Sequence, residues 1–274
     1  MQQKYLEQTN QELRLRNYSF KTIKAYLGCL RKYFDFKKFN LEKIDEENIK
    51  QFLLNKQDKN YSSQTINLYL NAIKFFYREV LKIPKKINLK FAKRSKKLPI
   101  VLSREEIKNI INAIRNPKHK LIISLAYGAG LRISEVISLK VKDINLEELT
   151  IHLKSAKGKK DRITIFPEKI KGDLQNLIAG KNLDSYVFES ERGGKLTERT
   201  GQKVFKNALR EAGIKKDATF HSLRHSFATH LLENGVDTRY VQELLGHQNI
   251  RTTQIYTKVT NPKLKNIKSP LDNI

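Results

Sequence analysis

Residues 219–257 constrain the chain most, because helix-forming apolar spacing, helix stops and chemically active side chains follow one another there. The stretch reads TFHSLRHSFATHLLENGVDTRYVQELLGHQNIRTTQIYT. A helix that begins near Thr219 places His221 and Arg224 on one face. An apolar stripe that starts at Leu223 lies beside that face. We therefore expect the polar face to point away from the core.

Two glycines divide this stretch into separate helices. Gly235 is expected to end the first helix, and Gly246 is expected to end the second. Between them, Asp237 or Thr238 can begin the second helix. The chain then leaves the second helix directly at His247.

A last short helix carries Tyr256, and Thr252 or Thr253 is expected to cap it. Folding of the three helices brings together two imidazoles, a guanidinium and a phenol. Arginine binds phosphate oxygens in pairs, histidine transfers protons, and tyrosine can act as a covalent nucleophile. This set of side chains suits reactions at a phosphate ester.

Residues 1–82 predict a small helical bundle, because apolar side chains recur at helical intervals behind serine or aspartate caps. The expected caps are Ser19, Asp45, and Ser62 or Ser63. A weaker helix is expected around residues 5–15. The single cysteine, Cys29, falls within the apolar pattern, which favours a buried thiol and excludes an internal disulfide.

A basic segment follows the bundle. Residues 82–98 carry eight lysines or arginines and no acidic residue, so we place a linker at residues 83–98. Such a run is usually solvated, but between two domains it would let both close around a duplex. The second domain is then expected to span residues 99–260.

The formal net charge of +26 points to a polyanionic partner. DNA, RNA and an anionic membrane surface all fit this charge. The sequence lacks an apolar run of about 18 residues, which disfavours the membrane. Its first residues are polar and do not resemble a signal peptide, so we expect a cytoplasmic, nucleoid-associated protein.

The second domain opens with a capping box at residues 103–106. The helix after it is expected to break at Gly128 and Gly130 and to restart with Arg132 near its new N-terminus, a position that favours an anion. Glu135 lies three residues further on and can orient the guanidinium of Arg132.

Residues 149–166 alternate apolar and polar side chains on both sides of a lysine-rich turn, which predicts a β-hairpin. A lysine at this turn can act as a general acid, and the pattern alone does not choose among Lys157, Lys159 and Lys160. Residues 187–188 are expected to add a short strand. A basic helix is expected at residues 197–212 and can enter a DNA groove.

Three strings resemble the motifs of the tyrosine recombinases. HSLRH at 221–225, LLGH at 244–247 and then Tyr256 resemble their C-terminal motif. YGAGLRISE at 127–135 is similar to their first arginine motif, and AKGKKDR at 156–162 to their hairpin lysine motif. The resemblance covers nearly the whole chain, and its compact size is most similar to the Xer-type members.

The resemblance implies a catalytic set of Arg132, Lys157, His221, Arg224, His247 and Tyr256. In this family the arginines and the second histidine bind the phosphate, and the tyrosine attacks it. His221 is then the candidate general base, and Lys157 protonates the departing 5′-hydroxyl. The product is a 3′-phosphotyrosyl link, and the resemblance implies no metal, no ATP and no other cofactor.

The same resemblance implies a mainly α fold with a small β-hairpin or sheet, in which an N-terminal SAM-like DNA-binding domain precedes an α+β catalytic domain. Its implied partners are double-stranded DNA with a specific site and further copies of the chain, as a homotetramer on two duplexes. Residues 261–274 would be a tail that packs into a neighbouring protomer, although a frayed terminus fits their sequence almost as well. The implied role is resolution of chromosome or plasmid multimers, with integration or excision as the alternative.

Two other classes share part of this pattern. A type IB topoisomerase uses the same tyrosine chemistry, but the compact bundle and the LLGH string disfavour it. A DNA-binding protein with an idle site is the other alternative, and the presence of every catalytic side chain disfavours it. A metal site at His221 and His225 is disfavoured because no third ligand follows at a plausible spacing.

Overall fold

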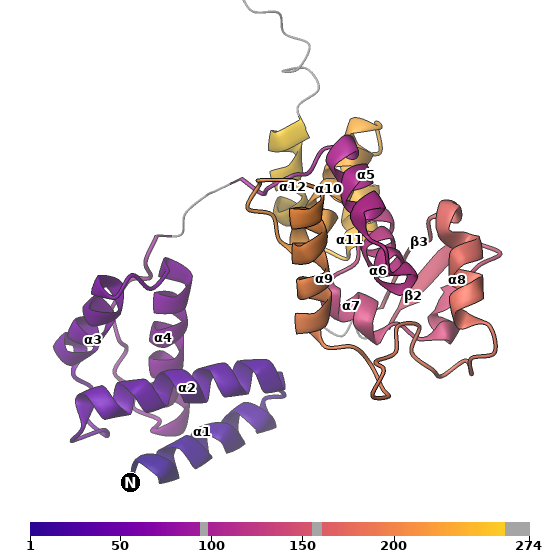
Figure 1. The fold of residues 1–274 in the computed structure, drawn as a ribbon. Helices are drawn as coiled ribbons and strands as arrows, with labels where there is room; N and C mark the ends of the chain where they lie inside the picture. Colours follow the sequence, from indigo (N-terminus) through magenta and orange to yellow (C-terminus); the bar gives the residue numbers. More distant parts are fainter. Residues whose placement is uncertain (94–97, 155–160, 261–274) are drawn as a thin grey trace, which may run out of the picture. The chain divides into compact units, whose positions relative to one another are not determined.

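The computed structural model describes residues 1–93, 98–154 and 161–260 (Figure 1). The chain divides into two compact units, Met1–Lys97 and Leu98–Ile274. Both units are mainly helical, as the sequence predicted, and the second contains a small sheet. None of the helices in the described ranges is long and apolar enough to cross a membrane.

The first unit is a helical bundle in which α2 packs between α1 and α4. Serine and aspartate side chains begin its helices as predicted, since Ser19, Asp45 and Ser62 each accept a backbone N–H of the first turn. Its elements are α1 (Gln2–Leu15), α2 (Phe20–Lys37), α3 (Glu46–Asp58), α4 (Ser63–Phe75) and the π-helical turn η1 (Phe76–Val80).

The core of the first unit is aromatic. Phe34 and Phe76 meet edge to face with ring centroids 4.9 Å apart, and Tyr33 meets Phe52 at 5.3 Å. Such edge-to-face pairs add stability beyond their buried area. Cys29 lies in the same core, where burial raises the pKa of its thiol to about 11, so the prediction of a buried thiol is confirmed.

Part of the segment expected to be a solvated linker packs on this bundle. Ile87 is buried in the aromatic core. The Asn67 side chain exchanges two hydrogen bonds with the backbone of Ala92, at 2.9 and 2.8 Å, and Lys74 donates to the carbonyl of Leu89 at 2.9 Å. Apolar residues between the lysines of this segment therefore pack on the bundle, while Lys85 and its basic neighbours stay exposed.

The second unit wraps its helices around α6, in which every residue from Leu121 to Ala126 is buried. The capping box at Ser103 and the helix break after Gly128 are present as predicted. The helices of the unit are α5 (Arg104–Ala113), α6 (Pro117–Gly128), α7 (Ile133–Ser138), α8 (Lys171–Ile178), α9 (Glu198–Glu211), α10 (Phe220–Glu233), α11 (Thr238–Leu245) and α12 (Ile250–Thr260), with the 3₁₀ turns η2 (Val141–Asp143) and η3 (Glu168–Ile170).

A small antiparallel sheet lies beside these helices, in the order β1 (Ile144–Asn145), β2 (Thr150–Leu153) and β3 (Arg162–Ile165). The pairing of β2 with β3 confirms the predicted hairpin, whose tip lies outside the described residues. The strand expected at residues 187–188 is wrong. Val187 and Phe188 are buried, but the strand pairing beside them is limited to two isolated bridges. Tyr186 pairs with Lys140, and Glu189 pairs with Lys195.

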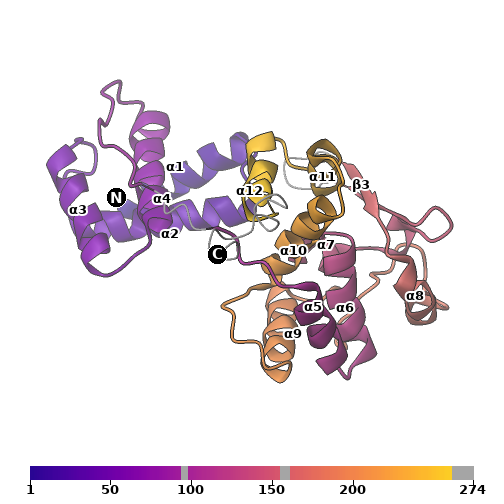
Figure 2. The same cartoon turned by 90° about the horizontal axis from the view of Figure 1, so that it is seen from above.

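The last three helices, α10, α11 and α12, pack on one another (Figure 2). Asp237 caps α11, and Gly246 ends it with a left-handed φ of 62°, as predicted. The expected start of α12 at Thr252 or Thr253 is wrong, because the helix already begins at Ile250. The reason is Asn249, whose side-chain oxygen accepts the N–H of Arg251 at 2.9 Å and so caps the helix earlier.

Candidate active site

The structure brings five of the six predicted site residues into one region of the second unit. Arg132 is the N-cap of α7, His221 and Arg224 lie on α10, His247 follows α11, and Tyr256 lies on α12. The sixth predicted residue, Lys157, lies outside the described residues.

A single carboxylate, Glu135, holds the arginines together. Its two oxygens accept the Arg132 guanidinium at 2.7 Å and both terminal nitrogens of Arg162 at 2.7 and 2.8 Å. Arg224 approaches the same carboxylate at 3.9 Å. Burial alone would raise the pKa of Glu135, but the hydrogen bonds and charges of Arg162 and Arg132 lower it to about 2. We call these four residues the Glu135 cluster.

Arg162 is a member of this cluster that we did not predict. The alternation of β3 suggests that its isoleucines face inward, yet Ile163 is 61% exposed and Arg162 is buried. The Arg162 side chain also donates to the carbonyl of Leu244 at 3.0 Å, which ties β3 to the end of α11. The signal that could have revealed Arg162 is the pairing register of the hairpin, because a shift of one residue moves Arg162 and Thr164 to the core face and the isoleucines to solvent.

Arg224 is fully buried, contrary to our expectation that the polar face of its helix points away from the core. It donates to the carbonyls of Gly130, at 2.6 Å, and Leu245. Burial and repulsion from Arg132 lower its pKa to about 9, so the group stays charged at neutral pH. Among the described residues, its Nε has no hydrogen-bond partner.

Both the side chain and the backbone of His247 are held by hydrogen bonds. Its Nδ1 lies 2.9 Å from the hydroxyl of Thr253, and its carbonyl accepts the Gln242 amide at 2.8 Å. The preceding Gly246 has to be small, because a Cβ there would lie 2.7 Å from the Arg162 side chain. Burial and the charges of Arg224 and Arg132 lower the pKa of His247 to about 3.

Tyr256 is 2% exposed and contacts two histidines. Its hydroxyl lies 3.0 Å from Nδ1 of His225, and its ring stacks on His247 with centroids 6.3 Å apart. Burial raises the pKa of Tyr256, and the charges of Arg224 and Arg132 partly oppose this rise. We did not predict His225 as a site residue, although it lies within the string HSLRH.

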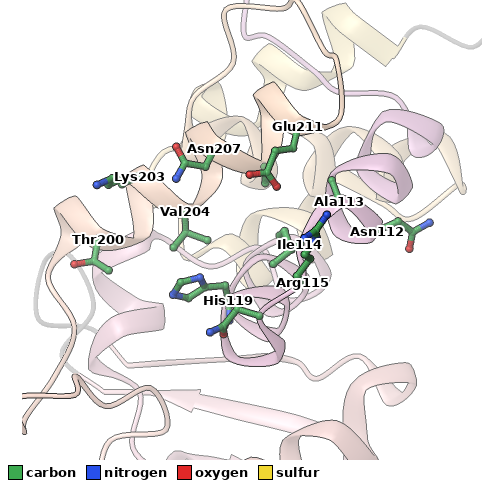
Figure 3. A pocket seen from close by; sticks show the side chains of 12 residues that line it. Asn112, Ala113, Ile114, Arg115, His119, Thr200, Lys203, Val204, Asn207 and Glu211 are labelled. Atoms are coloured by element: carbon green, nitrogen blue, oxygen red, sulfur yellow. The ribbon is translucent and has the colours of Figure 1, made fainter.

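A separate cavity of about 1050 Å³ opens between α9 and the connection from α5 to α6 (Figure 3). His119, Arg115 and Lys203 are among the side chains that line it. The Glu135 cluster, the histidines around Tyr256 and Tyr256 itself do not line this cavity. The gathered residues therefore belong to another part of the unit.

Comparison with known proteins assigns both units. Residues 5–87 match the N-terminal SAM-like domain of phage integrases, and residues 101–262 match the phage integrase family. The tyrosine recombinase XerA of Pyrococcus furiosus is 42% identical over 78% of this chain and 77% of its own length. The tyrosine recombinase XerD of Oceanobacillus iheyensis is 35% identical over 92% of both chains.

A solved structure shows the same fold. The crystal structure of the XerH site-specific recombinase, bound to a palindromic difH substrate as a post-cleavage complex, is similar with a TM-score of 0.73 and 26% identity. The similarity covers 91% of this chain and 80% of that chain. The predicted resemblance is thereby confirmed, and the chain belongs to the phage integrase family of site-specific tyrosine recombinases.

Proposed function

We propose that this protein recombines DNA at a specific site by cutting and rejoining strands through a 3′-phosphotyrosyl link. The observation that carries the proposal is the convergence of Arg132 and Arg224 on Glu135, with His247 and Tyr256 packed beside them. This arrangement combines fixed positive charge with a tyrosine nucleophile, which is what phosphoryl transfer to a side chain requires.

The Glu135 cluster has a surplus of positive charge, since one carboxylate faces three guanidiniums. A phosphodiester brings a negative charge, and its transition state spreads that charge over the oxygens of the phosphate. Donors that are already in place stabilise this state without reorganisation. We assign two donors to the phosphate, the imidazole of His247 and the Nε of Arg224, which has no partner among the described residues.

The proposed reaction follows from these positions. The Tyr256 oxygen attacks phosphorus, the bond from phosphorus to the 5′-oxygen breaks, and Lys157 supplies a proton to the departing 5′-hydroxyl. Attack by the 5′-hydroxyl of another strand then reverses these steps and releases the tyrosine. Because the covalent link conserves the energy of the phosphodiester, we expect the reaction to need neither ATP nor a metal ion.

We further propose double-stranded DNA as the partner, with residues 1–82 as the N-terminal DNA-binding domain. The XerH relative is a site-specific recombinase bound to a palindromic difH substrate in its crystal structure, and the net charge of +26 suits a polyanion such as DNA. By similarity to Xer recombinases, a homotetramer on two duplexes would resolve chromosome or plasmid multimers at the nucleoid, with integration or excision as the alternative. The proposed swapped tail, residues 261–274, lies outside the described residues.

The nucleophile is tested with nicked DNA that contains a candidate site, because loss of the short fragment beyond the nick traps the covalent intermediate. Wild type should form an adduct that survives denaturation, and Tyr256→Phe should form none. Tyr240→Phe is the matched control, since Tyr240 is exposed on α11. Tight binding of the same DNA by wild type without an adduct would favour a DNA-binding protein with an idle site.

The general acid is tested with the alanine variants of Lys157, Lys159 and Lys160. A substrate with sulfur in place of the bridging 5′-oxygen has a leaving group that needs no proton. We expect Lys157→Ala to cleave ordinary DNA about 100-fold or more slowly and to recover on the sulfur substrate. Recovery by one of the other two variants would move the assignment to that lysine.

A further inference from the structure

The proposed reaction requires a group that receives the proton of Tyr256, and the family resemblance assigns this role to His221. The structure places a different histidine at the tyrosine. We propose that His225, one helical turn after His221, accepts this proton. This inference rests on the proposed function, because it concerns the nucleophile of the same reaction.

The geometry favours His225. Its Nδ1 lies 3.0 Å from the Tyr256 hydroxyl, which is hydrogen-bonding distance for direct proton transfer. The two rings are close, with centroids 5.5 Å apart. The His221 ring packs edge-on against the His225 ring, with centroids 4.6 Å apart, and His221 itself is exposed.

The packing of α10 against α12 fixes this contact. His225 is half-buried on α10, between residues of that helix that are fully buried, Arg224 and Ser226. Tyr256 is buried on α12, where its ring also stacks on His247. Neither ring can move far without loss of these contacts, so the hydroxyl and Nδ1 are held together before substrate arrives.

The protonation states also fit this role. Burial, together with the neighbouring His221 and Arg224, lowers the pKa of His225 to about 4, so its imidazole is neutral at neutral pH. Burial raises the pKa of Tyr256, so its hydroxyl keeps its proton in the free protein. The tautomer with hydrogen on Nε2 then leaves Nδ1 free to accept from the hydroxyl. A bound phosphodiester offsets the charge of Arg224 and makes His225 more basic when the proton has to move.

The O–H bond of Tyr256 breaks and its proton moves to Nδ1 of His225, while the tyrosine oxygen forms a bond to phosphorus. The bond from phosphorus to the 5′-oxygen breaks, and Lys157 supplies the proton for that oxygen. In the rejoining step, the 5′-hydroxyl returns its proton to Lys157 and attacks phosphorus, the bond from phosphorus to the tyrosine oxygen breaks, and His225 returns its proton to the tyrosine. No oxidant, reductant or further reactant takes part.

The test compares His225→Ala, His225→Asn and His221→Ala on the nicked substrate with sulfur at the 5′ position, so that only the nucleophile side limits cleavage. The asparagine oxygen can accept a hydrogen bond near the position of Nδ1 but cannot take up a proton. We expect both His225 variants to bind DNA normally and to cleave about 100-fold or more slowly, and His221→Ala to lose less. Cleavage by His225→Asn at nearly the wild-type rate would overturn the proposal, because the histidine would then only position the tyrosine.

A second measurement separates proton transfer from damage to the fold. A fluorinated tyrosine at position 256 has a more acidic phenol and depends less on a base. The fluorinated tyrosine should raise the cleavage rate of His225→Ala by a larger factor than that of the protein with His225 intact. An equal factor in both proteins would overturn the proposal. Adduct formation by wild type distinguishes failure of the proposed function from failure of this inference alone. A wild type that forms no adduct refutes the proposed function and this inference with it, whereas a normal adduct with active His225 variants refutes this inference alone.

Discussion

The two units of the chain bury polar groups in opposite ways. In the first unit, the hydroxyls of Tyr33 and Tyr77 meet at 3.2 Å inside an aromatic core, and both groups are neutral. In the second unit, the charged side chains of Arg162 and Arg224 are buried, and that of the partly buried Glu135 is 9% exposed. Neutral hydroxyl pairs are inexpensive to bury, whereas ions lose strong hydration. The first unit therefore avoids the desolvation penalty of buried ions, whereas the second retains a charged cluster that suits an anionic ligand.

The largest expected effect is the loss of the one negative charge in the Glu135 cluster. Glu135→Gln should destabilise the second unit by about 3–5 kcal/mol, because it leaves buried guanidiniums without a counter-charge. Hydrogen exchange resolved by peptide would show the loss in the second unit and not in the first. Glu105→Gln is the matched control, since this side chain is exposed at the start of α5. Equal losses in both units would contradict the contrast between them.

The converse change removes a ring from the aromatic core. Phe76→Ala should destabilise the first unit by about 3 kcal/mol, because Phe76 is fully buried and packs on Phe34. The same exchange measurement should now show the loss in the first unit. Phe39→Ala serves as the control, since Phe39 is 79% exposed. An unchanged first unit would show that its aromatic packing contributes little.

Acid should affect the two units differently. The folded-state pKa of His225 is about 4 and that of His247 about 3, both below the ordinary value of 6.5. The unfolded chain therefore binds protons first, so the stability from these histidines is present above pH 6.5 and is lost as the pH falls. We expect the second unit to lose about 2 kcal/mol between about pH 7 and 5, a figure reduced for partial solvent exposure.

The first unit is an internal control for this pH effect, because all six histidines of the chain lie after residue 98. Exchange rates, corrected for the intrinsic effect of pH, should show a nearly constant first unit over the same range. The double variant His225→Asn, His247→Gln should flatten the response of the second unit. A response that persists in this variant would assign the acid sensitivity to other groups.

The smallest expected effect concerns the neutral pair. Tyr77→Phe removes a hydroxyl that contacts Tyr33 and accepts from Lys37 at 2.9 Å. The first unit should lose about 1 kcal/mol, the usual net value of such hydrogen bonds. Equilibrium unfolding of this variant, with the half-exposed Tyr18→Phe as control, would measure it. A loss as large as that of Glu135→Gln would remove the distinction between neutral and charged burial.

Features that depend on neighbours in the sequence were predictable. The caps at Ser19, Asp45 and Ser103 and the left-handed Gly246 follow from local backbone chemistry, and the structure has each of them. Arg132, Arg224 and Tyr256, which the resemblance named as site residues, lie in one region of the second unit.

Features that depend on distant contacts were not predictable. Arg162 faces inward because Glu135, 27 residues earlier in the chain, offers it a bidentate partner that outweighs the apolar alternation of β3. His225 meets Tyr256 only because α10 packs on α12. The early start of α12 depends on the side chain of Asn249, which competes with the two threonines as a cap.

The shared carboxylate of Glu135 also limits how such enzymes can be recombined with one another in the laboratory. The start of α7, strand β3 and helix α10 each contribute an arginine to it, and Arg162 connects further to the end of α11. A chimera with a junction anywhere between Arg132 and Arg224 would pair the carboxylate from one parent with at least one guanidinium from the other. In a chimera, the segment that holds the Glu135 cluster should therefore be exchanged as one piece or left intact.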